Sequence, residues 1–394
     1  MHALNGRSGD GCLRIGFVSI QDASDVTAWS GIPFQILTEM RAQHVDVDVM
    51  SPLSTRAKYL LAPVKVISKV RKESVTLDHF PLVLRAYARQ IENFVRQRSV
   101  DVVFSPSTIP VTLLECGKPI VTWTDAVFHA MHGYYSEAFG DMTDAAAARG
   151  RWQEETALRN CSIAAYASTW ALEGASRITD VSKLRVLPFG SSLPVNHTAE
   201  DIARFAAAKR SRRKDQCELL FVGVNWERKG GPIAVETARL LNEAGIQTTL
   251  RVVGSRPSCD LPSFVDIVGF LNKSSESGKQ KLIDLYRSAD FFILPTQAEA
   301  AGIVFSEASS FGLPSLTYST GGVPDYVRNG VNGVCLASGS SAAEFAMAIK
   351  QMISTHGEYS AYSSRAFQEY EERLNWKRSV RELVQLCSEC AHVG

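Results

Sequence analysis

Two carboxylates eight positions apart are the residues of this chain whose spacing most directly suggests chemistry. Glu299 and Glu307 lie in the stretch ADFFILPTQAEAAGIVFSEASSFGLPSLTYSTGGVPDYV, residues 289–327. Residues 291–294 read as a buried strand and 303–311 as a helix, so Glu299 falls in the loop beyond a strand's carboxyl end, where open α/β sheets bind ligands. Ionised carboxylates accept hydrogen bonds from paired hydroxyls. We therefore expect the two to face one crevice, one holding a sugar ring and the other a ribose diol.

Groups that attract phosphate lie around these carboxylates. The helix start at Gly302, Ile303 and Val304 offers backbone N–H groups without intrahelical partners and a partial positive charge. Lys229 stands beside glycines at a strand-to-helix turn, a position suited to neutralising a diphosphate. The Gly-Gly-Val-Pro turn at 321–324 could add further N–H donors. The pattern predicts a site for a nucleotide sugar.

The elements that must position these groups are parallel strands and helices. Short β-branched runs alternate with helical patterns along the 394 residues, which predicts an α/β fold with two Rossmann-like parallel sheets, each in a domain of roughly 200 residues. Strands are expected at 13–20, 45–50, 100–104, 119–123, 163–167 and 184–187, and then at 218–224, 248–253, 265–269, 291–294 and 315–318. The expected divisions are a flexible tail (1–12), a first domain (13–195), a polar and basic linker (196–214), a second domain (215–369) and a terminal helix that packs back on the first domain (370–394).

Composition excludes several classes of protein. Lys and Arg total 42 against 41 Asp and Glu, so the net charge of +1 provides no global field for nucleic acid. No apolar run approaches the roughly 20 residues of a membrane-spanning helix, and the first residues do not read as a signal peptide. The eight cysteines are scattered, which favours a reducing cytoplasm. His129 and His132 lack a third ligand by spacing, so no metal ion is expected.

Four motifs in order give the chain a family resemblance. It resembles the retaining family-4 glycosyltransferases of the two-domain GT-B fold. The Glu-x7-Glu motif matches Glu299 and Glu307, the lysine-glycine turn matches residues 229–230, and the Gly-x-Pro helix end and the Gly-Gly-Val-Pro turn match 312–314 and 321–324. The resemblance implies two domains facing across a cleft and transfer of a sugar from a nucleotide donor with retention at the anomeric carbon. It implies no cofactor and no metal, since the nucleotide sugar is a substrate.

The resemblance also implies roles for single residues. The nucleotide would lie on the second domain, and the first domain would face the acceptor. The implied catalytic residues are Glu299, Lys229 and Asp125; the donor-binding residues are Arg228, Glu307, Gly302, Ile303, Val304, Gly31, Gly269 and Phe270; and the acceptor-side residues are His129 and Trp29.

Two positions depart from the family pattern. Thr124 stands where many members carry a histidine beside the retained Asp125, which leaves the contact with the donor sugar open. Val224 stands where many carry an arginine that supports the lysine, and Arg228 is the candidate substitute. Because of these departures, a non-catalytic nucleotide-sugar-binding protein stays an alternative. A nucleotide-sugar epimerase of the same architecture is another.

The sequence leaves the partners open in three respects. A UDP-sugar is the first expectation for the donor and a GDP-sugar the second. The acceptor is either a saccharide or a lipid-linked molecule. Residues 56–98 hold ten Lys or Arg against three Asp or Glu. This segment is either a solvated helical face or a peripheral contact with the inner face of an anionic membrane.

Overall fold

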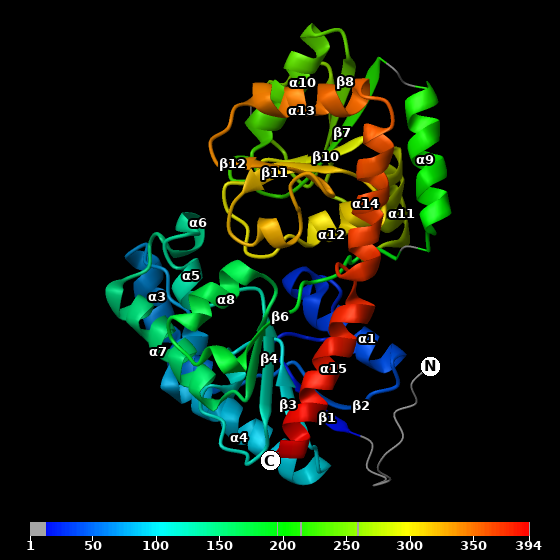
Figure 1. Ribbon diagram of the computed structural model, residues 1–394. Helices are drawn as coiled ribbons and strands as arrows, with labels where there is room; N and C mark the ends of the chain where they lie inside the picture. Colours follow the sequence, from blue (N-terminus) through cyan, green and yellow to red (C-terminus); the bar gives the residue numbers. More distant parts are fainter. Residues whose placement is uncertain (1–12, 195, 213–214, 258–259, 394) are drawn as a thin grey trace, which may run out of the picture.

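Two parallel sheets of six strands each organise the protein. The computed structural model describes residues 13–393 except 195, 213–214 and 258–259 (Figure 1). The expected tail at 1–12 lies outside the described residues. The sheets fall in successive halves of the chain and form two domains, as the alternation of strands and helices predicts.

The first sheet has the strand order β2-β1-β3-β4-β5-β6. All its pairings are parallel, because a crossover connection, helical in most cases, returns the chain to the same edge after each strand. Its strands are β1 (Arg14–Val18), β2 (Asp46–Met50), β3 (Val102–Ser105), β4 (Ile120–Thr124), β5 (Ile163–Tyr166) and β6 (Leu184–Val186). Its helices are α1 (Ile32–Ala42), α2 (Ala57–Leu60), α3 (Ala62–Val70), α4 (Pro81–Arg98), α5 (Phe128–Met131), α6 (Ser136–Phe139), α7 (Asp144–Asn160) and α8 (Thr169–Ser176).

The second sheet has the order β12-β11-β10-β7-β8-β9 and is also parallel throughout. The edge strand β12 was not expected from the sequence. Its strands are β7 (Gln216–Val222), β8 (Gln247–Val253), β9 (Val265–Gly269), β10 (Phe291–Leu294), β11 (Ser315–Ser319) and β12 (Gly333–Ala337). The helices of this half are α9 (Ala199–Arg212), α10 (Gly231–Glu243), α11 (Glu276–Ser288), α12 (Ile303–Ser310), α13 (Ala342–Ser354) and α14 (Glu358–Glu372), followed by α15 (Trp376–Val393).

The range expected as a linker contains the helix α9. Ile202 and Ala206 on this helix are buried, and α9 packs along α14 at the side of the second domain (Figure 1). Polar residues at its start and the basic residues toward its end made the range read as a connection. The helix is instead part of the second domain, because its apolar positions lie four apart on one face.

The chain returns to the first domain at its end. Helix α14 lies on the second domain, and α15 runs along the first, where it contacts α1 and β3 (Figure 1). Trp376 at the start of α15 stacks on Phe189, with ring centroids 5.5 Å apart, and meets Trp123 edge-on at 5.7 Å. This aromatic cluster packs the start of α15 into the core of the first domain.

Candidate active site between the domains

A cavity of about 290 Å³ lies between the domains, at the carboxyl ends of strands from both sheets. Asp125 follows β4 directly, and Glu299 follows β10 after a short loop. The cavity thus lies where parallel α/β sheets bind ligands. It is lined by Trp29, Ser30, Ile32, Asp125, Tyr135, Phe189, Lys229, Glu299, Ala300, Ala301, Ile303 and Val304, so six of the predicted site residues meet here.

Lys229 and Glu299 form an ion pair on one wall of this cavity. The Lys229 ammonium donates to the Glu299 carboxylate, and each side chain is only 13% exposed. Gly230 makes the approach of the two loops feasible, because it adopts a left-handed φ of 79° and a Cβ there would lie 2.1 Å from the carbonyl oxygen of Pro295. A ligand carrying both phosphate and hydroxyl groups could engage the cation and the carboxylate together.

Two tyrosines of the first domain hold the Glu299 loop from across the cleft. The Glu299 N–H donates to Tyr134 Oη at 3.0 Å, and the Ala300 N–H donates to Tyr135 Oη at 2.6 Å. Tyr134 Oη also lies 2.8 Å from Thr320 Oγ1. Sequence analysis missed both tyrosines. Their partners are backbone groups about 165 residues away, which no motif or spacing reveals.

The Gly-Gly turn after β11 acts on the same loop. The Gly322 N–H donates to the carbonyl oxygen of Glu299 at 2.9 Å, so this donor, expected for phosphate, holds the loop instead. A Cβ on Gly321 would lie 2.3 Å from that same oxygen, which requires glycine for so close a packing. The loop is therefore fixed from both domains.

The opposite wall of the cavity has an unusual backbone. Trp29, Ser30 and Gly31 adopt positive φ angles of 46°, 57° and 79°, and a Cβ on Gly31 would lie 2.8 Å from the carbonyl oxygen of Val26. Strained residues of this kind persist where the surrounding fold enforces them, and they concentrate at functional sites. The turn places Trp29 at the cavity, and the absence of a side chain on Gly31 lets the turn pack closely against Val26.

Asp125 is a partly buried acid that lines the cavity. Burial raises the pKa of its carboxyl, while hydrogen bonds from Thr124, at 3.3 Å, from Trp29 and from the backbone act in the opposite direction. Thr124, which replaces the expected histidine, is itself buried. Its hydroxyl therefore donates to Asp125 and does not line the cavity.

Helix α12 begins at the cavity. Gly302 caps it, and its first residues Ile303 and Val304 line the space. A Cβ on Gly302 would lie 2.3 Å from the Phe305 ring, so glycine is needed for the tight entry into the helix. The N–H groups of a first helical turn have no intrahelical acceptor. The helix start and the Lys229 ammonium together give this wall hydrogen-bond donors suited to phosphate.

Glu307 does not face this cavity. Its side chain is fully buried, and its carboxylate accepts from Tyr286 Oη at 3.0 Å and from the Lys273 ammonium. The expectation of two carboxylates in one crevice is therefore not met, because the helix turns Glu307 toward α11 and the loop after β9. Lys273 was not identified from the sequence. It is about one-third exposed, so it is the accessible part of this buried pair.

The remaining predicted donor residues also lie outside the 290 Å³ cavity. Gly269 ends β9 with a φ of 81°, and Phe270 beyond it is largely exposed. Arg228 donates to the carbonyl oxygen of Ala298 at 2.5 Å and lies 3.8 Å from the Glu137 carboxylate of the first domain. Arg228 therefore connects the two domains at the rim, and Val224 is exposed to solvent.

His129, expected on the acceptor side, is held away from the cavity. Its Nε2 lies 3.2 Å from the Glu155 carboxylate on α7, and its Nδ1 is buried without a partner among the described residues. Glu154, the neighbour of Glu155, is a buried acid that sequence analysis also missed. One of its oxygens accepts the Phe128 N–H at 3.3 Å, and burial raises the pKa of this carboxyl to about 7.

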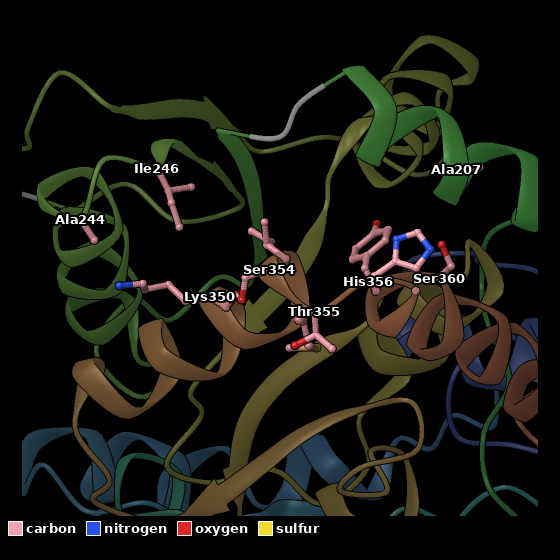
Figure 2. A pocket seen from close by; sticks show the side chains of 12 residues that line it. Ala207, Ala244, Ile246, Lys350, Ser354, Thr355, His356 and Ser360 are labelled. Atoms are coloured by element: carbon pink, nitrogen blue, oxygen red, sulfur yellow. Dashed lines mark hydrogen bonds between the residues drawn. The ribbon is translucent and has the colours of Figure 1, made fainter.

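A larger cavity of about 890 Å³ lies in the second domain, away from the cleft (Figure 2). It is bordered by α9, the turn from α10 to β8 and the junction of α13 with α14. Lys350, Ser354 and His356 are among the side chains around it in Figure 2. None of the predicted site residues lines it, so it is separate from the groups that could act on a nucleotide sugar.

The sequence of the second domain matches a known family. Residues 203–369 match the family described as glycosyl transferases group 1. Over this range the second domain is similar to the group 1 glycosyltransferases. The match runs from α9 into α14 and includes Lys229 and Glu299, whereas Asp125 and Trp29 lie outside the matched range.

Curated proteins with similar sequences are also glycosyltransferases. The D-inositol 3-phosphate glycosyltransferase of Rhodococcus jostii is 26% identical over 217 residues, which are 52% of this chain and 47% of that protein. That of Acidothermus cellulolyticus is 26% identical over 359 residues, which are 81% of this chain and 76% of that protein. The matches to the Rhodococcus protein and to a Catenulispora acidiphila relative thus span about half of those proteins.

Solved structures establish the fold of the whole chain. Anabaena HepE in complex with UDP-glucose has a TM-score of 0.62 and 15% identity, and the match covers 96% of this chain and all of that one. Sucrose-phosphate synthase from Thermosynechococcus elongatus has a TM-score of 0.68 at 15% identity, over 97% of this chain and all of that one. The predicted GT-B fold, with two facing parallel-sheet domains around the cleft, is confirmed.

Proposed function

We propose that the protein is a retaining hexosyltransferase that uses a nucleotide sugar, a UDP-sugar before a GDP-sugar, and a saccharide or lipid-linked acceptor. The observation that carries this proposal is the Lys229–Glu299 pair beside the start of α12, in a cavity shared by both domains. The match of residues 203–369 to the group 1 glycosyltransferases supports it, as does the UDP-glucose bound to the structurally similar Anabaena protein.

The proposed chemistry assigns one task to each wall of the cavity. Lys229 and the first N–H groups of α12 stabilise the diphosphate as its charge grows, which lowers the barrier because these donors are already in place. Glu299 accepts hydrogen bonds from sugar hydroxyls. Asp125 is the second acceptor for the sugar and also holds Trp29 and Thr124 in place.

The proposed reaction needs no protein nucleophile. The bond between the anomeric carbon and the phosphate oxygen breaks, and the acceptor oxygen forms its bond on the same face. The acceptor proton passes to the departing phosphate oxygen. The nucleotide sugar is a substrate, and no metal ion is required in this scheme.

Nucleotide binding is the first test of the proposal. A ligand that binds only the folded state raises the melting temperature. We expect UDP to raise it more than GDP or ADP, and we expect Lys229→Ala to remove most of that shift. Absence of a shift with all three nucleotides would contradict the proposal.

Product analysis then separates transfer from its alternatives. With a UDP-hexose and a mixture of saccharide acceptors, we expect a new glycoside with the anomeric configuration of the donor, as read by NMR. An isomerised donor formed without acceptor would instead indicate an epimerase. Binding without any turnover would indicate a non-catalytic protein.

A further inference from the structure

Helices α2 and α3 expose their apolar side chains to solvent. Tyr59, Leu60, Val66, Ile67 and Val70 are between 51% and 79% exposed. The only buried side chain on the two helices is a serine, Ser68. Helices of a soluble domain normally turn their apolar stripe toward the core. This pair does the reverse, so its apolar face has no partner within the described chain.

The same segment is strongly basic. Residues 56–72 contain six Lys or Arg and no Asp or Glu. Lys58 pairs with Asp78 at 2.8 Å. Within the described part of the chain, no carboxylate lies within ion-pair distance of the other five, which are Arg56, Lys65, Lys69, Arg71 and Lys72.

Helix α4, the other part of the basic region at 56–98, behaves differently. Its apolar residues, including Tyr87, Ile91 and Phe94, are buried in the core of the first domain. Its exposed face carries charged side chains such as Arg85 and Arg89. A solvated face therefore describes α4, on which Leu82 is exposed among charged side chains, whereas α2 and α3 combine five exposed large apolar side chains with unpaired cations.

A small basic cavity adjoins α3. It has a volume of about 210 Å³ and lies between α3 and the start of α7, with Arg71 and Arg149 against a single acid, Glu73. The Arg149 guanidinium lies over the Phe80 ring, 4.1 Å from its centroid, and no carboxylate of the described residues pairs with it. Hydroxyls of Ser68, Ser74 and Thr143 complete a donor-rich lining of a kind that accepts a phosphate group.

We propose that α2 and α3 dock the protein on a bilayer that contains anionic phospholipid. The apolar side chains enter the boundary between headgroups and acyl chains, the lysines contact the anionic surface, and a headgroup phosphate occupies the cavity of Arg71 and Arg149. No helix of the described residues has the length and apolar character to cross a membrane, so this contact is peripheral.

The docking surface is on the same side of the first domain as part of the cleft wall. Figure 1 shows α3 with α5, α6 and α7 on this side. The Ser74 N–H donates to the carbonyl oxygen of Asp141 at 2.8 Å, which ties the end of α3 to the segment after α6. Tyr134 and Tyr135 immediately precede α6. Docking would thus bring the cleft toward a lipid-linked acceptor, and in this choice of acceptor the inference rests on the proposed function.

Vesicle sedimentation with the full chain tests the surface. The probes are vesicles of phosphatidylcholine alone and of phosphatidylcholine mixed with phosphatidylglycerol. We expect binding to the mixed vesicles only, and a decrease as salt is added. Removing two lysines with Lys65→Ser and Lys69→Ser should weaken it about 30-fold, since each basic residue near an anionic surface contributes a factor of about five. Val66→Ser with Val70→Ser should weaken it about tenfold through lost apolar insertion.

The matched control removes equal charge from α4. Arg85→Ser with Arg89→Ser should bind the mixed vesicles as the wild type does. Equal loss in this control would overturn the assignment to α2 and α3, because only net charge would then matter. Failure of the wild type to bind mixed vesicles would overturn the proposal altogether, in favour of a protein partner on this face.

The outcome is independent of the test of the proposed function. Vesicle binding is measured without a nucleotide, and the UDP-induced thermal shift without vesicles. All variants of α2 and α3 should retain the UDP shift of the wild type, which also shows that they fold.

Discussion

Removing one hydroxyl from Tyr135 should loosen the Glu299 loop. Its Oη accepts the Ala300 N–H at 2.6 Å from across the domain interface. Tyr135→Phe retains the ring, which lies 5.4 Å from the Arg228 guanidinium, and so deletes only the hydrogen bond. A buried N–H left without an acceptor costs about 1–3 kcal/mol. This cost falls on the closed arrangement, where the loop meets Tyr135, and much less on an opened one, where water can replace the hydroxyl.

The expected result is a loss of about 5- to 150-fold in kcat/KM, since each 1.4 kcal/mol corresponds to a factor of ten. The assay is initial-rate transfer from a UDP-hexose, with the far-UV spectrum and melting temperature as checks of folding. Tyr59→Phe is the matched control, because its ring is 79% exposed and its hydroxyl makes no hydrogen bond within the described residues. If Tyr135→Phe transferred sugar at the wild-type rate, the reasoning that this contact positions the loop would be refuted.

Three further predictions concern the site and its support. Gly230→Ala should destabilise the fold by more than about 3 kcal/mol in urea unfolding, because its Cβ would lie 2.1 Å from a carbonyl oxygen. Gly245→Ala is the control and should cost only about 1 kcal/mol, since Gly245 has a similar φ of 80° and nothing within 4 Å of the added Cβ. Equal losses in the two variants would contradict the steric argument. Glu299→Gln and Lys229→Ala should each abolish transfer with the fold intact, and full activity in either would remove that residue from the site. The pKa of Glu154 is raised from 4.5 to about 7, so the folded protein retains a proton that the unfolded chain releases, and stability falls as pH rises from about 4.5 to 7. Glu154→Gln should remove about 3 kcal/mol of that decline, as measured by urea unfolding across this pH range. An unchanged pH profile in the variant would show that Glu154 does not titrate there.

The local pattern of apolar and turn residues in the sequence was sufficient to predict most of the architecture. Buried parallel strands such as β5 and β10 are continuous apolar runs, and turn residues bound them, so their positions follow from sequence alone. Strand β12 lacks this signal because it is a short edge strand, GVCLA, that begins with a glycine and is only partly buried. Helix α9 was obscured because most of its apolar residues are alanines and equally many residues are polar or charged.

The candidate site likewise contains residues that the local sequence pattern predicts and residues that it does not. Lys229 and Glu299 are placed by motifs that act within a few residues, a glycine turn and a strand-loop-helix, and they meet in the cavity. Glu307 was misplaced because its environment depends on Tyr286 and Lys273, which come from α11 and the loop after β9. Tyr135 was missed for a related reason, since its partner is a main-chain N–H of the other domain.

The path of α15 makes the first domain discontinuous along the chain. Val380, Leu383 and Cys387 of this helix are buried against the first domain, although some 180 residues of the second domain separate them from it in sequence. During synthesis, the first sheet emerges long before the helix that covers it, whereas the second domain can complete its own core first. A fragment that ends after the first sheet would therefore present a bare apolar face. A separate peptide spanning Trp376–Val393, coexpressed with such a fragment, should restore the fragment's solubility.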